Sequence, residues 1–404
     1  MLSKDKEEVS MGKEQTLSTE KIFCGILFFL VLLNGLGRLA VFSDNTSFAF
    51  LQNALQIPVY IILVFLIIFK LLRQKITNKN IGIYCLTFLI GFVLLLGYVQ
   101  SDKASFFRAF LLILAAKDIN IKKILRVSRR AYVVSLVVGA ALFFLGISVG
   151  SQRRNFVSWG FVHPNVTGEI MMLIALLWIG EHSELPLKKL SLISVILGGG
   201  IYCFTGSRTA TISLLILAVL LPLTSFFMKK GVGKILCLIH PVLLWFTYIS
   251  AATLTTSKFF QFLDTIFVNR IFLNYYALSK FGIKFFGQNV NLETTETVYN
   301  AIHNVWWSGT TVDSAYMTAI LMLGIIPTII WSTAYAYSMR IIYNSKNYVL
   351  FGIAAILCFE AFSETGMIDI YSSFTLFCIT ARIGECNIGT YRKSAKSLTE
   401  NTLQ

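Results

Sequence analysis

Apolar stretches long enough to cross a lipid bilayer recur along nearly the whole of this 404-residue chain. A transmembrane helix needs about 20 mostly apolar residues, within a range of roughly 17–25. Hydrophobic residues make up 56% of the sequence and charged residues only 14%, a balance typical of multi-pass membrane proteins. Because lipid offers the backbone no hydrogen-bond partners, such runs are expected to be helical. We therefore predict an all-α polytopic membrane protein.

The apolar runs predict about twelve spans. These spans cover residues 22–42, 54–69, 81–99, 105–116, 131–149, 164–179, 190–205, 208–227, 235–253, 315–339, 347–363 and 367–381. They divide the chain into a tail at 1–21, a nine-span bundle at 22–253, a long loop at 254–313, a three-span bundle at 314–381 and a second tail at 382–404. The polar N-terminal tail has no cleavable-signal pattern, so the first span is expected to direct insertion.

Basic residues predict which side of the membrane each loop occupies, because Lys and Arg gather in cytoplasmic loops. With a cytoplasmic N-terminus, the inside segments are 1–21, 70–80, 117–130, 180–189, 228–234, 340–346 and 382–404, and they hold 25 of the 35 basic residues. We therefore predict that both termini are cytoplasmic and that the loop at 254–313 is external. The net charge of +15 then reflects topology. Without a soluble domain to carry that charge, we expect no nucleic-acid partner.

The ten basic residues outside those segments indicate an anion-binding outer face. They are Arg38, Lys103, Arg108, Arg153, Arg154, Arg208, Lys258, Arg270, Lys280 and Lys284. Six are arginines, although lysine outnumbers arginine by 22 to 13 over the chain. Topology requires only positive charge, whereas a planar guanidinium can grip phosphate or carboxylate with two parallel hydrogen bonds. A purely structural role for these arginines is the alternative.

Polar groups crowd the entrance of the sixth predicted span. Such groups are costly at a membrane boundary and so are candidate functional residues. Arg153 and Arg154 are candidates for binding an anionic head group or a diphosphate, with snorkelling to anionic lipid as the alternative. His163 and Asn165 flank a proline suited to a first helical turn, so they are candidates for substrate binding or base catalysis. Glu169 follows one turn later, where it should be paired or protonated.

A second candidate anion site lies in the sequence Thr205-Gly-Ser-Arg-Thr209, between two spans. The helix that follows presents unpaired N–H groups and its positive dipole end beside Arg208. Ser207 stands where a side chain can cap that helix. The alternative is a capped hairpin whose arginine anchors at the interface.

The long external loop holds the remaining candidates. Apolar residues recur at helical spacing over 259–267, which predicts an amphipathic helix lying on the membrane or closing over the bundle. Arg270 follows as a candidate anion ligand. His303 and Asp313 flank two tryptophans, whose faces can stack on sugars or mark the membrane interface. Asp313 and Tyr316 meet the tenth span, where Asp313 is a candidate base or a helix N-cap.

Neither a metal nor another cofactor is expected from this pattern. The acids of the outer face are scattered, whereas a divalent cation usually needs convergent carboxylates. The seven cysteines show no metal or redox spacing. Two acids near the end of the eleventh span, Glu360 and Glu364, are spaced to share a helix face and could pair with Arg38 or Arg108.

Four motifs taken in order resemble the Wzy-type polysaccharide polymerases, in particular those of Gram-positive capsule and exopolysaccharide clusters. These motifs are Gly160-Phe-Val-His-Pro-Asn165, Thr205-Gly-Ser-Arg-Thr209, Arg270 followed by Phe286-Gly-Gln288, and Asp313-Ser-Ala-Tyr316 with Gly324-Ile-Ile downstream. The resemblance covers roughly residues 150–330. The superfamily also holds the O-antigen ligases.

The resemblance implies a metal-independent, GT-C-like glycosyltransferase in the bacterial plasma membrane. It would polymerise oligosaccharide repeats carried on undecaprenyl diphosphate at the outer face, with a chain-length regulator and a flippase as further partners beside membrane lipids. The family's diphosphate-binding arginines correspond to Arg154, Arg208 and Arg270, and less closely to Arg153. Asp313 stands where the ligases carry histidine, and His303 is out of register, so the resemblance favours a polymerase.

Two alternatives remain at this point: a lipid-linked glycan ligase of the same superfamily, and a transporter or flippase. A flippase should line its spans with charge, whereas this chain gathers charge at the outer boundary. The base is also open. Asp313 is the first candidate, followed by His303, Glu169 and His163.

Overall fold

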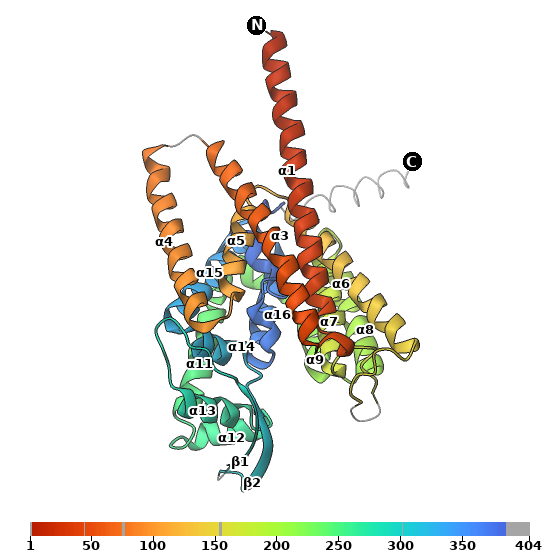
Figure 1. Cartoon of the computed structure of the whole chain (residues 1–404), viewed down its shortest axis with the longest axis vertical. Helices are drawn as coiled ribbons and strands as arrows, with labels where there is room; N and C mark the ends of the chain where they lie inside the picture. Colours follow the sequence, from red (N-terminus) through yellow and green to blue (C-terminus); the bar gives the residue numbers. More distant parts are fainter. Residues whose placement is uncertain (1, 44, 75–76, 153–155, 301, 385–404) are drawn as a thin grey trace.

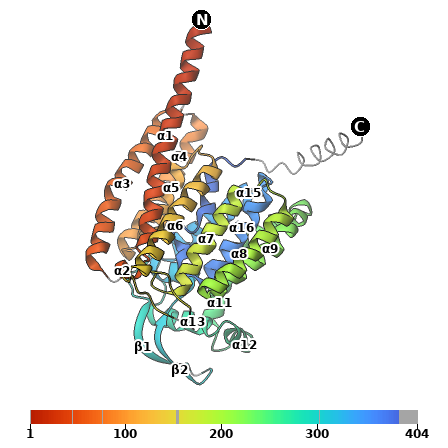
Figure 2. The same ribbon diagram turned by 90° about the vertical axis from the view of Figure 1, so that its right-hand side faces the viewer.

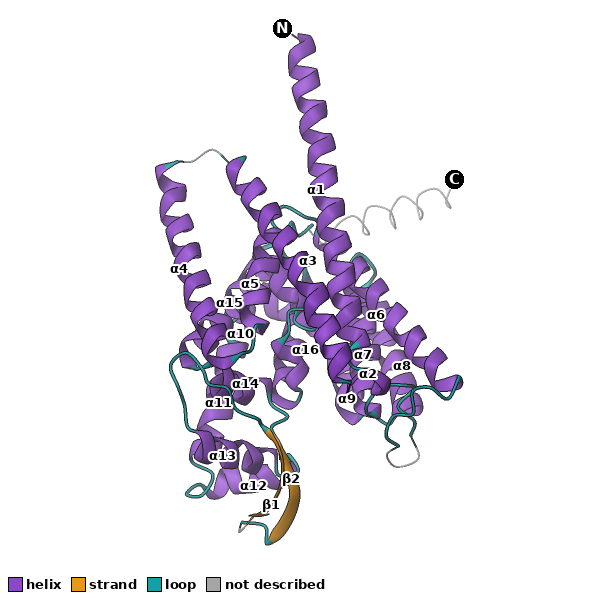
Figure 3. Ribbon diagram, viewed as in Figure 1, coloured by secondary structure: helices purple, strands orange, loops and turns teal. Residues whose placement is uncertain are grey.

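The computed structural model describes residues 2–43, 45–74, 77–152, 156–300 and 302–384, and helices make up most of it (Figure 1). The α-helices are α1 (Leu2–Leu36), α2 (Ala40–Ser43), α3 (Thr46–Leu72), α4 (Asn78–Ser101), α5 (Ser105–Ala115), α6 (Ile121–Phe144), α7 (Pro164–Glu181), α8 (Leu187–Thr205), α9 (Arg208–Lys229), α10 (Val232–Leu236), α11 (Ile239–Ala252), α12 (Lys258–Ile266), α13 (Arg270–Phe281), α14 (Ala315–Thr318), α15 (Ile325–Asn344) and α16 (Tyr348–Ser363). Two antiparallel strands, β1 (Glu293–Asn300) and β2 (Val305–Thr311), form a hairpin, drawn in orange in Figure 3.

The helical architecture predicted from the sequence is confirmed, and its apolar helices indicate a multi-pass membrane protein. Within the described residues, six helices are long and apolar enough to cross a bilayer: α1 from Ser18, α3, α4, α6, α8 and α9. Three shorter apolar helices, α5, α11 and α16, accompany them. The faces of α3 and α4 that point away from the bundle carry exposed Phe, Leu and Ile side chains, as expected of a lipid-facing surface.

The twelfth predicted span, 367–381, is not an α-helix. This part of the chain forms two 3-10 turns, η2 (Thr365–Ile368) and η3 (Phe374–Ile379). Between them the N–H groups of Ser372 and Ser373 both donate to the carbonyl oxygen of Asp369, at 3.1 and 2.9 Å. Asp and Ser favour such local turns over a continuous helix. The segment is buried against the other helices, where irregular backbone is tolerated at membrane depth.

The tenth predicted span is broken at Gly324, which has φ +90°. Before it, α14 runs into a π-helical turn, η1 (Ala319–Leu323), and after it α15 begins. The extended segment 284–288 crosses this break. Ile325 N donates to Lys284 O at 3.0 Å, and Gln288 N donates to Met322 O at 2.9 Å. The break therefore holds the end of the long loop against the bundle, with its backbone groups hydrogen-bonded.

One end of the bundle gathers many of the basic segments, and we call it the basic end. Lys70 Nζ donates to the carbonyl oxygens of Ala115 and Lys117 at 2.6 and 2.9 Å. Lys123 pairs with Glu20 at the same end. Ile121 N donates to Arg382 O at 3.0 Å, which joins the chain beyond η3 to this group.

The opposite end, the hairpin end, carries α12, α13 and the β1–β2 hairpin (Figure 2). The loop after α1 lies at this end beside the loop before α7. Ala40 N donates to Gly160 O at 2.9 Å, and Val162 N donates to Arg38 O at 3.2 Å. The segments that the charge pattern assigns to the outer side thus meet here.

We predict that Gly324→Ala destabilises the protein. A Cβ at this position would lie 2.2 Å from Gly287 N, and a positive φ strains any residue with a side chain. Backbone strain alone should cost about 1–3 kcal/mol of stability. The detergent-solubilised variant should therefore lose its monodisperse peak at a lower temperature than the wild type. Gly199→Ala is the matched control, because a Cβ there meets nothing within 4 Å inside α8. Equal melting temperatures for Gly324→Ala and Gly199→Ala would contradict the close approach of Gly287 to Gly324.

Candidate functional site

A buried ion pair joins Arg38 and Glu169 at the hairpin end. Arg38 Nη1 lies 3.0 Å from Glu169 Oε1, and the two side chains are 18% and 10% exposed. Arg38 stands between α1 and α2, and Glu169 is in the second turn of α7. Gly366 lies against both groups, since a Cβ there would be 2.4 Å from Glu169 Oε1 and 2.9 Å from Arg38 Nη2. The chain therefore passes close to this pair at a glycine, and a larger residue there would have to displace the Glu169 carboxylate or the Arg38 guanidinium.

A second pair, more open to solvent, joins Arg270 and Asp313. Arg270 Nε lies 3.7 Å from Asp313 Oδ2. Arg270 also donates from Nη1 to the carbonyl oxygen of Ser363 at 2.8 Å. Asn269, in a left-handed conformation with φ +63°, turns the chain so that α13 begins with Arg270. The guanidinium therefore connects the long loop to the end of α16 and to Asp313, which lies just before the N-cap residue of α14.

The segment from Ser363 to Gly366 runs between these two pairs, and Glu364 is its ionisable residue. Ser363 O accepts from Arg270, and Gly366 touches Arg38 and Glu169. Glu364 follows the last residue of α16, outside the membrane-spanning segments. Burial raises the pKa of the Glu364 carboxyl to about 8; Glu169, Glu360 and Asp313 also raise it, and Arg270 opposes them. Glu364 is therefore a largely neutral acid at pH 7, set among charged neighbours.

The third pair lies within the long loop, between His303 and Asp264 of α12. His303 Nε2 is 3.0 Å from Asp264 Oδ2. Asp264 is fully buried, and its Oδ1 accepts from Phe272 N at 2.9 Å. One carboxylate thus fixes both the imidazole and the first turn of α13. A carboxylate behind an imidazole holds the ring in one orientation.

A further polar group adjoins the Arg38 pair. The hydroxyls of Tyr60 and Tyr371 lie 3.0 Å apart, and the Arg108 guanidinium stands 5.6 Å from the centre of the Tyr60 ring. The carboxylate of Asp369 interacts electrostatically with Arg38 and with both tyrosines. Tyr60 and Tyr371 therefore lie near both Arg108 and Asp369, next to the helical turns η2 and η3.

The structure locates the predicted site residues as follows. Arg153 and Arg154 lie outside the described residues. Arg208 is exposed at the first position of α9, and Ser207 before it is buried. Gly168 packs so closely on Ser207 that a Cβ on the glycine would be 2.3 Å from the serine Cβ. The starts of α7 and α9 are thus adjacent.

Two of the predicted site residues, His163 and Tyr316, make structural contacts. His163 caps α7, with Nδ1 accepting from Asn165 N at 3.0 Å. Tyr316 is fully buried and donates from its hydroxyl to Cys358 O at 2.8 Å. Neither contact tests a role in substrate binding.

The alternative role considered for Asp313, an N-cap, is taken by its neighbour. Ser314 is the N-cap of α14, and its hydroxyl accepts from Met317 N at 3.4 Å. Asp313 is instead directed to Arg270. The pairing considered for Glu360 and Glu364 with Arg38 also differs, since the ion pair of Arg38 is with Glu169.

The sequence analysis left Asp264, Gly366 and Asp369 out of the site, and it named Arg38 only as a basic residue on the outer side and as a possible partner of Glu360 or Glu364. Asp264 had a readable signal, because it is an acid on the polar face of a predicted amphipathic helix. Gly366 and Asp369 had none, because Gly366 directly precedes the predicted span 367–381 and Asp369 falls within it. Their importance comes from contacts with residues about 200–330 positions away along the chain.

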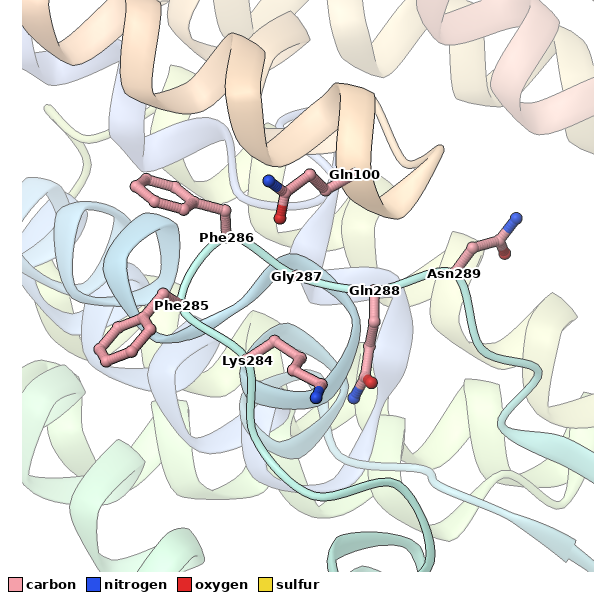
Figure 4. A pocket seen from close by; sticks show the side chains of 7 residues that line it. All are labelled: Gln100, Lys284, Phe285, Phe286, Gly287, Gln288 and Asn289. Atoms are coloured by element: carbon pink, nitrogen blue, oxygen red, sulfur yellow. The ribbon is translucent and has the colours of Figure 1, made fainter.

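A pocket of about 540 Å³ opens beside the Gly324 break (Figure 4). It is lined by Gln100, Lys284, Phe285, Phe286, Gly287, Gln288 and Asn289. The Gln288 amide donates to the carbonyl oxygens of Phe281 and Gly282, at 3.3 and 3.1 Å, which fixes this loop. Amide, amine and aromatic groups around one opening are suited to a polar ligand with apolar faces, such as a sugar.

Among the described residues, no group of three His, Cys, Asp or Glu side chains is arranged to hold a metal ion. Comparison with known proteins finds no family model, no curated protein and no solved structure that matches the chain.

We predict strong coupling between Arg38 and Glu169. Removing one partner of a buried pair strands the other charge and costs about 3–5 kcal/mol, whereas replacing both with apolar groups costs much less. Arg38→Met and Glu169→Leu should each lower the melting temperature of the purified protein, and the double variant should recover much of that loss. If the double variant loses the sum of the two single effects, the pair is not coupled.

We predict that Glu364 makes stability depend on pH. Its folded-state pKa of about 8 exceeds the ordinary value of 4.5, so its contribution is full below about pH 4.5 and is lost as pH rises through about 8. Each unit of pKa difference corresponds to about 1.4 kcal/mol. Between pH 5 and 8 the wild type should lose more thermal stability than Glu364→Gln, which cannot ionise. Parallel pH profiles for the two proteins would contradict the raised pKa.

Proposed function

We propose that this protein is a membrane glycosyltransferase that polymerises oligosaccharide repeats carried on undecaprenyl diphosphate. The observation that carries the proposal is the Arg270–Asp313 pair at the hairpin end. It combines an arginine suited to a diphosphate with a carboxylate suited to a hydroxyl proton, next to a loop that closes over one end of an apolar bundle. The motif resemblance to Wzy-type polymerases points to the same reaction class.

The chemistry requires two things of the protein. The acceptor sugar hydroxyl attacks the anomeric carbon of the donor glycan, and the bond from that carbon to the carrier diphosphate breaks. The bonding electrons leave with the diphosphate, whose negative charge Arg270 and Arg208 would stabilise by charge-assisted hydrogen bonds. The hydroxyl proton passes to a base, a step worth roughly 10²–10⁴-fold in rate.

Asp313 remains the first candidate for that base. Its side chain is 41% exposed, and its distance of 3.7 Å from Arg270 is longer than a hydrogen bond. A diphosphate that engages Arg270 would compete with this contact, so that the carboxylate could turn toward the acceptor hydroxyl. His303 is the second candidate, because its contact with buried Asp264 fixes the orientation of its imidazole. Glu169 is less accessible, being paired with Arg38.

A neutral Glu364 fits the same proposal. An anionic diphosphate near Arg270 would be repelled by an ionised carboxylate at this position, whereas a protonated carboxyl can donate a hydrogen bond. The pocket lined by Gln100 and Lys284 would take sugar residues of the repeat. We also propose a GT-C-like bundle of about twelve membrane passages in a bacterial plasma membrane, with cytoplasmic termini. On this view the hairpin end faces outward.

The topology prediction is tested by labelling intact cells with an impermeant maleimide. Thr297→Cys is exposed on β1 at the hairpin end, and Lys189→Cys is exposed at the start of α8. The first should be labelled in intact cells and the second only after lysis. The parent protein, which carries its natural cysteines, gives the background. Protection of residue 297 until lysis would invert the orientation.

The activity prediction uses purified protein and a lipid-linked oligosaccharide repeat. The wild type should produce a ladder of longer glycans on the carrier lipid. Transfer to a different acceptor would indicate a ligase, and movement of the unaltered substrate across vesicles would indicate a flippase. Lys230→Ala, a charge removal on an exposed side chain after α9, is the matched control and should keep full activity.

Substitutions at three positions assign the roles. Arg270→Ala and Arg208→Ala should each lose about tenfold activity or more, since a charge-assisted hydrogen bond contributes about 1.5–3 kcal/mol. Lysine at either position should restore activity only partly, because it lacks the guanidinium fork. Asp313→Asn keeps the shape of the side chain but removes the base. Normal polymer formation by Asp313→Asn would move the base to His303.

A further inference from the structure

Helix α12 has an apolar face that the rest of the described chain leaves uncovered. Phe259, Phe262 and Ile266 are 61%, 64% and 56% exposed, and they stand three or four residues apart, along one side of the helix. Val268, immediately beyond the helix, is 67% exposed. Large apolar side chains gathered in this way indicate an interaction surface.

The opposite face of α12 is fixed to the protein. Asp264 is fully buried and binds Phe272 N and His303. Phe260 and Leu263 pack with the buried residues of α13, and the Phe267 ring stands 5.1 Å from that of Phe362. The helix is thus held in one rotation, so the exposed face cannot turn inward without breaking the contacts of Asp264.

Phe260 links the apolar side of α11 to the exposed face of α12, because its ring stands 5.9 Å from that of Phe246 and 5.3 Å from that of Phe259. A groove of about 530 Å³ joins the two helices, and its lining residues are Leu238, Pro241, Val242, Trp245, Phe246, Ile249 and Phe260. Every one of these residues except Phe260 comes from the segment of α11, which is one of the apolar helices of the bundle. With 14 residues, α11 rises only about 21 Å, whereas the hydrocarbon core of a bilayer is about 30 Å thick. Lipid in contact with α11 would therefore extend to the level of α12.

We propose that α12 lies in the membrane interface, with Phe259, Phe262 and Ile266 among the lipid acyl chains. Bilayer lipid is the occupant because the groove is continuous with the lipid-facing side of α11 and is lined by apolar groups throughout. Lys258 at the start of the helix is suited to reach lipid phosphate, as lysine does at interfaces. The amphipathic pattern allows a helix that lies on the membrane or one that closes over the bundle. We propose the first of these two roles.

The membrane contact has a consequence for the site. The buried face of α12 holds His303 directly and holds α13, which begins with Arg270, through Phe272. The membrane surface would therefore fix the position of His303 and Arg270 along the axis of the bundle. The proposal stands without the proposed glycosyl transfer, because it depends only on the shape and polarity of this surface.

The test is photo-crosslinking of the full-length protein in vesicles of phosphatidylethanolamine and phosphatidylglycerol. p-Benzoylphenylalanine is incorporated singly at Phe262 or Ile266, and lipid adducts are quantified by mass spectrometry. Trp245, exposed on α11, is the positive control, and Ser279, exposed on α13, is the aqueous control.

Adducts at residues 262 and 266 should approach the yield at 245 and exceed that at 279 by about tenfold or more. Yields at both positions no greater than at 279 would overturn the proposal. Crosslinks at these positions to a second copy of the chain, in place of lipid, would also overturn it, since the surface would then be a protein interface.

Discussion

The passage of residues 363–366 between two arginine–carboxylate pairs is the constraint on which the hairpin end depends. Arg270 binds the carbonyl oxygen of Ser363, and the Arg38–Glu169 pair lies directly against Gly366. These contacts bring together α1, α7, α13 and α16, which are far apart in sequence. Charges in an apolar bundle are tolerated only when they are paired, so this polar cluster also fixes how the helices meet.

Irregular backbone appears in the bundle only where its polar groups are satisfied. At Gly324 the interrupted helix exchanges hydrogen bonds with the segment 284–288, and at Asp369 the chain bonds to its own turn. A helix that crosses lipid alone could not accept either interruption. Both interruptions lie near the hairpin end and connect it to the bundle interior. The site is therefore built where the helical regularity of the bundle ends.

The long loop is a small folded unit and not a flexible connection. Asp264 organises it by binding the start of α13 and the imidazole of His303 with its two oxygens. One face of α12 thereby belongs to the protein, and the other remains apolar and exposed. The pairs at Arg38, Arg270 and His303 each combine a cationic group with a carboxylate, so the hairpin end presents several positive groups without a concentrated positive charge.

The sequence by itself determined the helical class, the amphipathic helix at 259–267 and the grouping of basic segments, because these depend on local hydropathy and charge. It also identified Arg270, Asp313 and His303 as residues of interest, since their chemistry is unusual beside apolar runs. Only the tertiary structure decided their partners. Glu169 pairs with Arg38, Ser314 rather than Asp313 caps α14, and 367–381 turns instead of forming a helix. Each of these features depends on contacts between segments far apart in the sequence. Such contacts cannot be predicted from hydropathy along the chain.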